Sequence, residues 1–307
     1  MRRKMKVLIT GDTGLLGANL CFLWRNKYDV VGVSRMNKSV CGIRHISQDL
    51  LKFDEIEYLI QTEMPDVIVH TAAMVSVDEC EKQPNTAESF NADMVKYVMK
   101  AAEKNGVYLI HISTDSFYQG NGNELCSENI PLVLKSKYAE TKRKGEINAL
   151  EYSNTLCLRT NIFGCNFKNK FSFSEWILCE LKAGNEITMF TDVLFSPILV
   201  NDLAYIIEMA ISNHLTGLYN AGGTGSISKY DFGVYLKEQL GIATGNIKPI
   251  SVEDFSFTAW RSHNMSMDSS KIQHKLSIEI PTIKQSIANY LSLLKTDYPK
   301  QLKEEQI

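Results

Sequence analysis

The chain of 307 residues is 44% apolar and 22% charged, a composition that supports a large folded core and argues against disorder. Its 33 basic and 35 acidic side chains leave a net charge of −2, which argues against a general nucleic-acid-binding protein. No apolar run reaches the roughly 18–20 residues of a membrane helix, and the cysteines and histidines show no metal-ligand spacing, so we expect a cytoplasmic protein with reduced thiols, no metal and no membrane partner.

Five apolar segments in the first half lack the alternation of a half-exposed strand, and this predicts strands that are buried on both faces. They are residues 5–10, 30–33, 66–71, 108–113 and 155–159. The helical spacing of apolar residues predicts helices at residues 15–24, near 54–60, at 90–104 and from about residue 136. Strands that alternate with helices in this way predict an α/β fold with a doubly wound parallel sheet.

The alternation stops after about Gly164, beyond which longer irregular segments separate the helices. Helices are predicted at residues 174–183, 202–212, 229–240 and 281–294. We expect the polar segment 295–307 to be a frayed tail. The chain therefore divides into a main domain and a smaller carboxy-terminal lobe. We assign residues 1–160 and about 195–222 to the main domain, and about 161–194 and 223–307 to the lobe.

Three glycines, Gly11, Gly14 and Gly17, follow the first strand directly and open the first helix. In dinucleotide-binding turns the first glycine allows the tight bend, the second lets a pyrophosphate approach the backbone, and the third lets the helix pack against the sheet. The N–H groups and the dipole of the helix start then hold the anion. A glycine-rich turn without a ligand is the alternative, but the position of the pattern favours a dinucleotide.

The end of the second strand indicates which dinucleotide binds. A carboxylate there would bind the ribose hydroxyls of NAD, whereas a 2′-phosphate favours a basic residue. This chain has Ser34, which can donate to the phosphate, and Arg35, which can neutralise it and stack on adenine. We therefore predict NADPH rather than NADH, with an ordinary surface arginine as the alternative.

Tyr138 and Lys142 form a Tyr-x-x-x-Lys pattern at the start of a helix, where residues four apart share a face. The pattern alone is expected by chance in this composition, so its position after the strand predicted at residues 108–113 makes it informative. That strand ends in Ser113, Thr114 and Asp115, at the sheet edge where such folds bind ligands. We expect Tyr138 to protonate a carbonyl oxygen during hydride transfer and Thr114 to orient that oxygen. Lys142 should hold the nicotinamide ribose and lower the pKa of the tyrosine.

The glycine and Tyr-x-x-x-Lys motifs resemble those of the extended short-chain dehydrogenase/reductases, and the chain is similar over nearly its whole length to the dTDP-4-dehydrorhamnose reductase family. The matching segments are residues 10–17, 65–73, 77–81, 90–92, 111–115, 131–132, 136–142, 158–160, 195–197, 202–204, 261, 267–268 and 271. The resemblance implies a Rossmann domain that binds NADP and a smaller lobe that binds substrate. It also implies the NADPH-dependent reduction of the 4-keto group of a nucleotide-linked deoxysugar.

The motifs and the resemblance together indicate which residues contact the ligands. The expected catalytic residues are Thr114, Tyr138 and Lys142. The expected cofactor-binding residues are Gly11, Thr13, Gly14, Leu15, Leu16, Gly17, Ser34, Arg35, Asp49, Leu50, Thr71, Ala72, Ala73, Tyr138 and Lys142. The expected substrate-binding residues are Ser113, Asp115, Asn161 and Arg261, of which Arg261 would hold the nucleotide diphosphate from the second lobe.

Departures from the family pattern leave the sugar and other functions open. Relatives usually carry an aromatic residue where this chain has Ser116 and a threonine where it has Ile198. They also usually carry a tryptophan in the segment after Arg159, where this chain has Asn161 and Ile162. A dehydratase would need a second carboxylate after Asp115, and an epimerase that retains NAD disagrees with Arg35. The alternatives are an epimerase or dehydratase of the same superfamily, or a non-catalytic NADP-binding regulatory subunit resembling the beta subunit of methionine adenosyltransferase. Homodimer formation is also left open.

Overall fold

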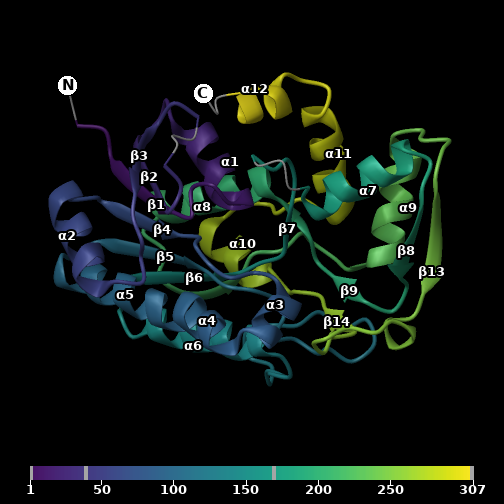
Figure 1. The fold of residues 1–307 in the computed structure, drawn as a ribbon, viewed down its shortest axis with the longest axis horizontal. Helices are drawn as coiled ribbons and strands as arrows, with labels where there is room; N and C mark the ends of the chain where they lie inside the picture. Colours follow the sequence, from purple (N-terminus) through teal and green to yellow (C-terminus); the bar gives the residue numbers. More distant parts are fainter. Residues whose placement is uncertain (1–2, 38–40, 168–170, 305–307) are drawn as a thin grey trace.

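The structure, a computed structural model, describes residues 3–37, 41–167 and 171–304, and within them it contains a seven-stranded parallel sheet (Figure 1). The strands lie in the order β11-β6-β5-β4-β1-β2-β3, and each neighbouring pair is parallel. They are β1 (Lys6–Thr10), β2 (Asp29–Ser34), β3 (Arg44–Ser47), β4 (Val67–His70), β5 (Tyr108–Ile112), β6 (Thr155–Arg159) and β11 (Gly217–Asn220). The order reverses at β1, which confirms the predicted doubly wound fold.

Helices cover both faces of this sheet (Figure 1). Val7 of β1 packs into a core with α1 and α8, whereas its neighbour Leu8 points to the other face and packs with α2 and α5. The helix α6 lies beside α5. These helices are α1 (Leu15–Trp24), α2 (Phe53–Glu63), α5 (Met94–Lys104), α6 (Lys137–Leu150) and α8 (Val200–Ser212). Successive residues of a strand face opposite sides, so burial on both faces explains the unbroken apolar runs of the strands.

The segment between β4 and α5 is more helical than the sequence predicts. It contains α3 (Val77–Lys82), α4 (Pro84–Glu88) and a π-helical turn, η1 (Ser89–Asp93). The short helices α3 and α4 lack the long apolar periodicity that predicts a helix, and each is held by its contacts with α6. This segment brings polar and aromatic side chains to the edge of the sheet.

The strands after β6 other than β11 lie outside the main sheet, and the parallel strands β8 and β13 form a small sheet of their own (Figure 1). The strands are β7 (Ile162–Phe163), β8 (Glu186–Phe190), β9 (Leu194–Phe195), β10 (Ile198–Leu199), β12 (Ile227–Ser228), β13 (Asn246–Ile250) and β14 (Asn264–Met265). The helices are α7 (Phe173–Lys182), α9 (Lys229–Gln239), the 3₁₀ turn η2 (Val252–Asp254), α10 (Ser270–Leu276) and α11 (Ile283–Leu293). Among the described residues, no helix is long and apolar enough to span a bilayer.

The carboxy-terminal segment is a helix rather than the frayed tail that its polar composition predicted. The helix α12 (Tyr298–Glu304) returns to the main sheet and packs on α1 (Figure 1). Leu302 is buried, and the Tyr298 hydroxyl donates to Asn19 Oδ1 at 2.6 Å. These two contacts stabilise a segment that is too short to be helical alone. The division into two domains remains a proposal. The helix α12 belongs by sequence to the proposed lobe, but it packs on α1 of the proposed main domain.

Arg159, at the end of β6, forms a buried ion pair with Glu146 of α6. Nε donates to Glu146 Oε2 at 2.9 Å and Nη2 donates to Oε1 at 2.6 Å. The two side chains are 1% and 0% exposed. Arg159 Nη1 also donates to the Tyr118 hydroxyl at 2.7 Å, and Ser113 donates to Glu146 at 3.0 Å. The pair therefore attaches α6 to β6 and to the loop after β5.

We predict that Glu146→Ala lowers the free energy of unfolding by about 3–5 kcal/mol, because it leaves a buried guanidinium without its carboxylate. Urea denaturation followed by circular dichroism measures this loss. The matched control is Glu140→Ala on the same helix, since Glu140 pairs with Lys137 at 2.7 Å with both side chains well exposed. The control should cost at most about 1 kcal/mol, and equal losses for the two variants would contradict the prediction.

Candidate active site

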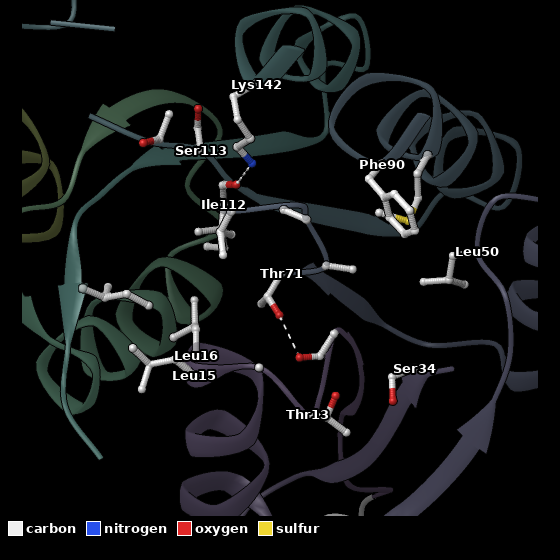
Figure 2. A pocket seen from close by; sticks show the side chains of 18 of the residues that line it. Thr13, Leu15, Leu16, Ser34, Leu50, Thr71, Phe90, Ile112, Ser113 and Lys142 are labelled. Carbon is white, nitrogen blue, oxygen red and sulfur yellow. Dashed lines mark hydrogen bonds between the residues drawn. The ribbon is translucent and has the colours of Figure 1, made fainter. Parts of the chain in front are cut away.

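A cavity of about 980 Å³ lies at the carboxyl edge of the sheet. It is lined by residues from the ends of β1, β2, β4 and β5 and from the start of α6. Figure 2 shows Thr13, Leu15 and Leu16 on one side, Ser34, Leu50 and Phe90 grouped at one end, and Ser113 with Lys142 at another. The lining includes the predicted cofactor-binding residues Gly11, Thr13, Gly14, Leu15, Leu16, Ser34, Arg35, Asp49, Leu50, Thr71, Ala72, Ala73, Tyr138 and Lys142.

The glycine turn forms a tight cradle at one side of this cavity. Gly11 has φ +69°, and a Cβ there would lie 2.7 Å from the Ala72 nitrogen. Gly14 precedes the first residue of α1 and has no side-chain cap, so the helix start presents backbone N–H groups toward the cavity. Gly17 does not line the cavity; a Cβ there would lie 2.3 Å from the Gly11 carbonyl oxygen. Gly17 thus acts by letting α1 pack against the turn.

The end of β2 brings Ser34 and Arg35 to the cavity. The Arg35 guanidinium carbon lies 4.9 Å from the centroid of the Phe90 ring. The structure also places a carboxylate near β2 that the sequence pattern did not reveal. Asp12 Oδ2 lies 2.6 Å from His45 Nδ1, and it lies close enough to Gly32 that a Cβ there would be 2.3 Å away. Asp12 is buried and is not part of the cavity lining, and its carboxylate pairs with His45.

The three predicted catalytic residues line the same part of the cavity. The Lys142 ammonium donates to the Ile112 carbonyl at 2.7 Å (Figure 2). Burial lowers the pKa of Lys142 to about 8. The expected lowering of the tyrosine pKa by this lysine is wrong for the protein alone. Burial raises the pKa of Tyr138 above its ordinary value, and a hydrogen bond with Thr114 only partly opposes the effect.

Asn91 supports the site from outside the cavity lining, a role that sequence reasoning did not assign. It is fully buried in η1, and its amide accepts from the Met74 nitrogen at 2.9 Å and donates to the Met74 carbonyl at 3.0 Å. The same amide nitrogen donates to Thr141 Oγ1 at 3.2 Å. Asn91 therefore joins the loop after β4 to the helix that carries Tyr138 and Lys142. A buried asparagine within a helical segment was the available signal, because such a side chain requires several partners.

The substrate-binding residues predicted near Thr114 lie together. Asp115 is 1% exposed, and its Oδ2 accepts from Asn161 Nδ2 at 2.6 Å. Burial raises the pKa of Asp115 to about 6, against the opposing effect of Asn161. Ser113 lines the cavity, but its hydroxyl donates a hydrogen bond to Glu146. Lys229 of α9 is a further charge near Asp115; its ammonium lies over the Phe195 ring, 3.3 Å from the centroid, and burial lowers its pKa to about 8.

Arg261 lies apart from the cavity lining. Its Nη2 donates to Asp78 Oδ2 of α3 at 2.7 Å, and its guanidinium carbon lies 4.4 Å from the Phe257 ring centroid. The side chains of Arg261 and Asp78 are 21% and 34% exposed. The structure therefore does not bring Arg261 together with the other predicted site residues. Ser116 and Ile162, where the chain departs from the family pattern, also line the cavity. Other lining residues for which no ligand contact was predicted are Val33, Met36, Gln48, Val75, Val77, Phe90, Met94, Ile112 and Thr160.

Residues 5–296 match the family model described as the RmlD substrate binding domain. The chain is 28% identical to the spore coat polysaccharide biosynthesis protein SpsK of Bacillus subtilis, over 81% of this chain and 84% of the relative. It is 25% identical to the dTDP-4-dehydrorhamnose reductase of Escherichia coli, over 95% and 99%. It is also 26% identical to the methionine adenosyltransferase 2 subunit beta of Pongo abelii, over 87% and 81%.

A solved structure of similar fold is the dTDP-4-dehydrorhamnose reductase of Bacillus anthracis in complex with NADP. Its TM-score is 0.85 at 26% identity, and the match covers 94% of this chain and 99% of that one.

We predict that Asp115→Asn changes stability in a pH-dependent way. The folded protein holds a proton on Asp115 up to about pH 6, whereas its ordinary pKa is 3.8. The wild type therefore loses stability relative to the variant as the pH rises from about 4 to about 6, by roughly 2–3 kcal/mol. Urea unfolding of both proteins at pH 4.5 and pH 7.5 measures this difference. A difference that is independent of pH would show that the carboxyl is not held protonated.

Proposed function

Because the chain belongs to the RmlD substrate binding domain family, we propose that it uses NADPH to reduce the 4-keto group of a nucleotide-linked deoxysugar, as a dTDP-4-dehydrorhamnose reductase does. It is an NADP-dependent oxidoreductase with a Rossmann fold. The observation that carries the proposal is that one cavity brings the glycine turn and the groups Thr114, Tyr138 and Lys142 together. A cytoplasmic location is a further part of the proposal.

The residues of the cavity fit NADPH. Gly11 and Gly14 leave the turn open for a pyrophosphate, since a Cβ at Gly11 would meet the Ala72 backbone at 2.7 Å. Ser34 and Arg35 supply a hydroxyl and a cation for the 2′-phosphate. Lys142 lies at the opposite part of the cavity, where its remaining ammonium donors can hold the nicotinamide ribose. When bound, NADPH supplies the hydride for the carbonyl carbon.

Tyr138 and Thr114 are placed to deliver the proton that the carbonyl oxygen requires during the reduction. Tyr138 is neutral at physiological pH, since burial raises its pKa above the ordinary value, and the neutral phenol is the form that can donate a proton to the carbonyl oxygen. Thr114 lies beside it and can donate a hydrogen bond to the same oxygen. A dehydration would need an additional acid or base, but the residue after Asp115 is Ser116, whose hydroxyl accepts from Thr114 at 3.1 Å. We therefore propose reduction rather than dehydration.

The decisive experiment mixes the protein with NADPH and dTDP-4-keto-6-deoxysugars and follows absorbance and product. We expect one NADPH to be oxidised for each keto group reduced. Tyr138→Phe should lower turnover by about 10²–10⁴-fold, because only the proton donor is lost, while NADPH affinity stays near the wild-type value. Cofactor binding without turnover on any 4-keto sugar would favour the regulatory alternative, and conversion of a 4-hydroxy sugar without net cofactor change would favour an epimerase.

We predict that Arg35→Ala weakens NADPH binding by about 1.5–3 kcal/mol, the usual contribution of a hydrogen bond to a charged group. NADH lacks the 2′-phosphate, so its affinity should change little. Nicotinamide fluorescence titrations of both cofactors measure the two dissociation constants. Equal losses for NADPH and NADH would remove the assignment of Arg35 to the phosphate.

We propose that Arg261 binds the diphosphate of the nucleotide sugar after exchanging its partner Asp78 for the ligand. The exchange is supported by the partial exposure of both side chains, since such an ion pair is held weakly. Arg261→Ala should raise the KM for the nucleotide sugar roughly tenfold or more, with little change in NADPH affinity. An unchanged KM would contradict the proposal and indicate that Arg261 serves only to pair with Asp78 of α3.

A further inference from the structure

Phe90 lies in η1, and its ring lines the cavity near Leu50 (Figure 2). A π-helical turn inserts an extra residue into a helix, and such turns are frequent at functional sites. The next residue, Asn91, is fully buried and bonds to the backbone of Met74. The turn therefore sends Asn91 into the protein while the Phe90 ring faces the cavity.

The guanidinium of Arg35 lies over this ring. Its carbon is 4.9 Å from the ring centroid, within the roughly 6 Å range of a cation–π contact. Arg35 is exposed, and within residues 3–37, 41–167 and 171–304 it has no carboxylate within 4.0 Å. An exposed arginine without an ion pair samples many rotamers. The Phe90 ring is thus the contact that holds the guanidinium at the mouth of the cavity.

We propose that Phe90 sets the preference for NADPH over NADH by holding Arg35 where the guanidinium meets the 2′-phosphate. The inference rests on the proposed use of NADPH. Ser34 lines the same end of the cavity, so the phosphate is received by a hydroxyl and by a cation that is already oriented. Less side-chain entropy is then lost on binding, which strengthens the interaction. NADH has no phosphate at this position, so the gain applies only to NADPH.

A direct contact between the Phe90 ring and adenine is the competing explanation. Adenine is common to NADPH and NADH, so such a contact would stabilise both cofactors to the same extent. The ratio of the two dissociation constants therefore separates the two explanations. If the ring holds Arg35 against the 2′-phosphate, its removal changes the dissociation constant of NADPH alone.

The test measures the Kd of NADPH and of NADH for the wild type, Phe90→Leu, Arg35→Ala and the double variant. Phe90→Leu should weaken NADPH binding about two- to fivefold, the usual range for an exposed cation–π contact, and leave NADH unchanged. In the Arg35→Ala protein the same substitution should have no further effect on NADPH, because the guanidinium that the ring holds is gone. This non-additivity is the specific signature of the proposal.

Two variants serve as controls. Phe90→Tyr keeps an aromatic face and should retain the wild-type ratio of the two constants. Met94→Leu changes another side chain of the cavity lining and should leave the ratio unaltered. Thermal unfolding of each variant identifies any loss of fold. Equal weakening of both cofactors by Phe90→Leu, or a full effect in the Arg35→Ala background, would overturn the proposal. If the wild type bound neither cofactor, the proposed function would fail instead.

Discussion

The active site depends on the buried ion pair between Arg159 and Glu146. Two charges removed from water are stable only when every polar atom finds a partner, and here the hydroxyls of Tyr118 and Ser113 complete the network. Glu146 lies one turn after Lys142 on α6, while Arg159 ends β6. The pair therefore sets the position of the helix that carries Tyr138 and Lys142 against the edge of the sheet, and it ties the loop after β5 into the same arrangement.

The close approach of α6 to η1 provides a second constraint. A Cβ at Gly145 would lie 2.0 Å from the Asn91 carbonyl oxygen, so only glycine allows this distance. The Asn91 side chain then reaches both Met74 and Thr141. As a result, the loop after β4 and the helix that carries Tyr138 are joined through the side chain of Asn91.

Burial governs the chemistry of the side chains in this unit. It lowers the pKa of Lys142 to about 8, raises that of Asp115 to about 6 and raises that of Tyr138 above its ordinary value. In each case a low-dielectric environment disfavours the charged form. The neutral phenol of Tyr138 is the form that can donate a proton to the carbonyl oxygen, and its raised pKa makes it a weaker acid than a free tyrosine.

The sequence alone determined the parallel sheet, the glycine turn and the placement of Tyr138 and Lys142 at one edge, because apolar periodicity and strand-to-helix motifs are local properties of the chain. Only the tertiary structure decided that Arg261 pairs with Asp78 outside the cavity and that Phe90 lies under Arg35. It also decided that α12 forms and packs on α1. These features depend on contacts between residues far apart in the chain, and the pKa of a buried group depends on how completely the fold removes it from water.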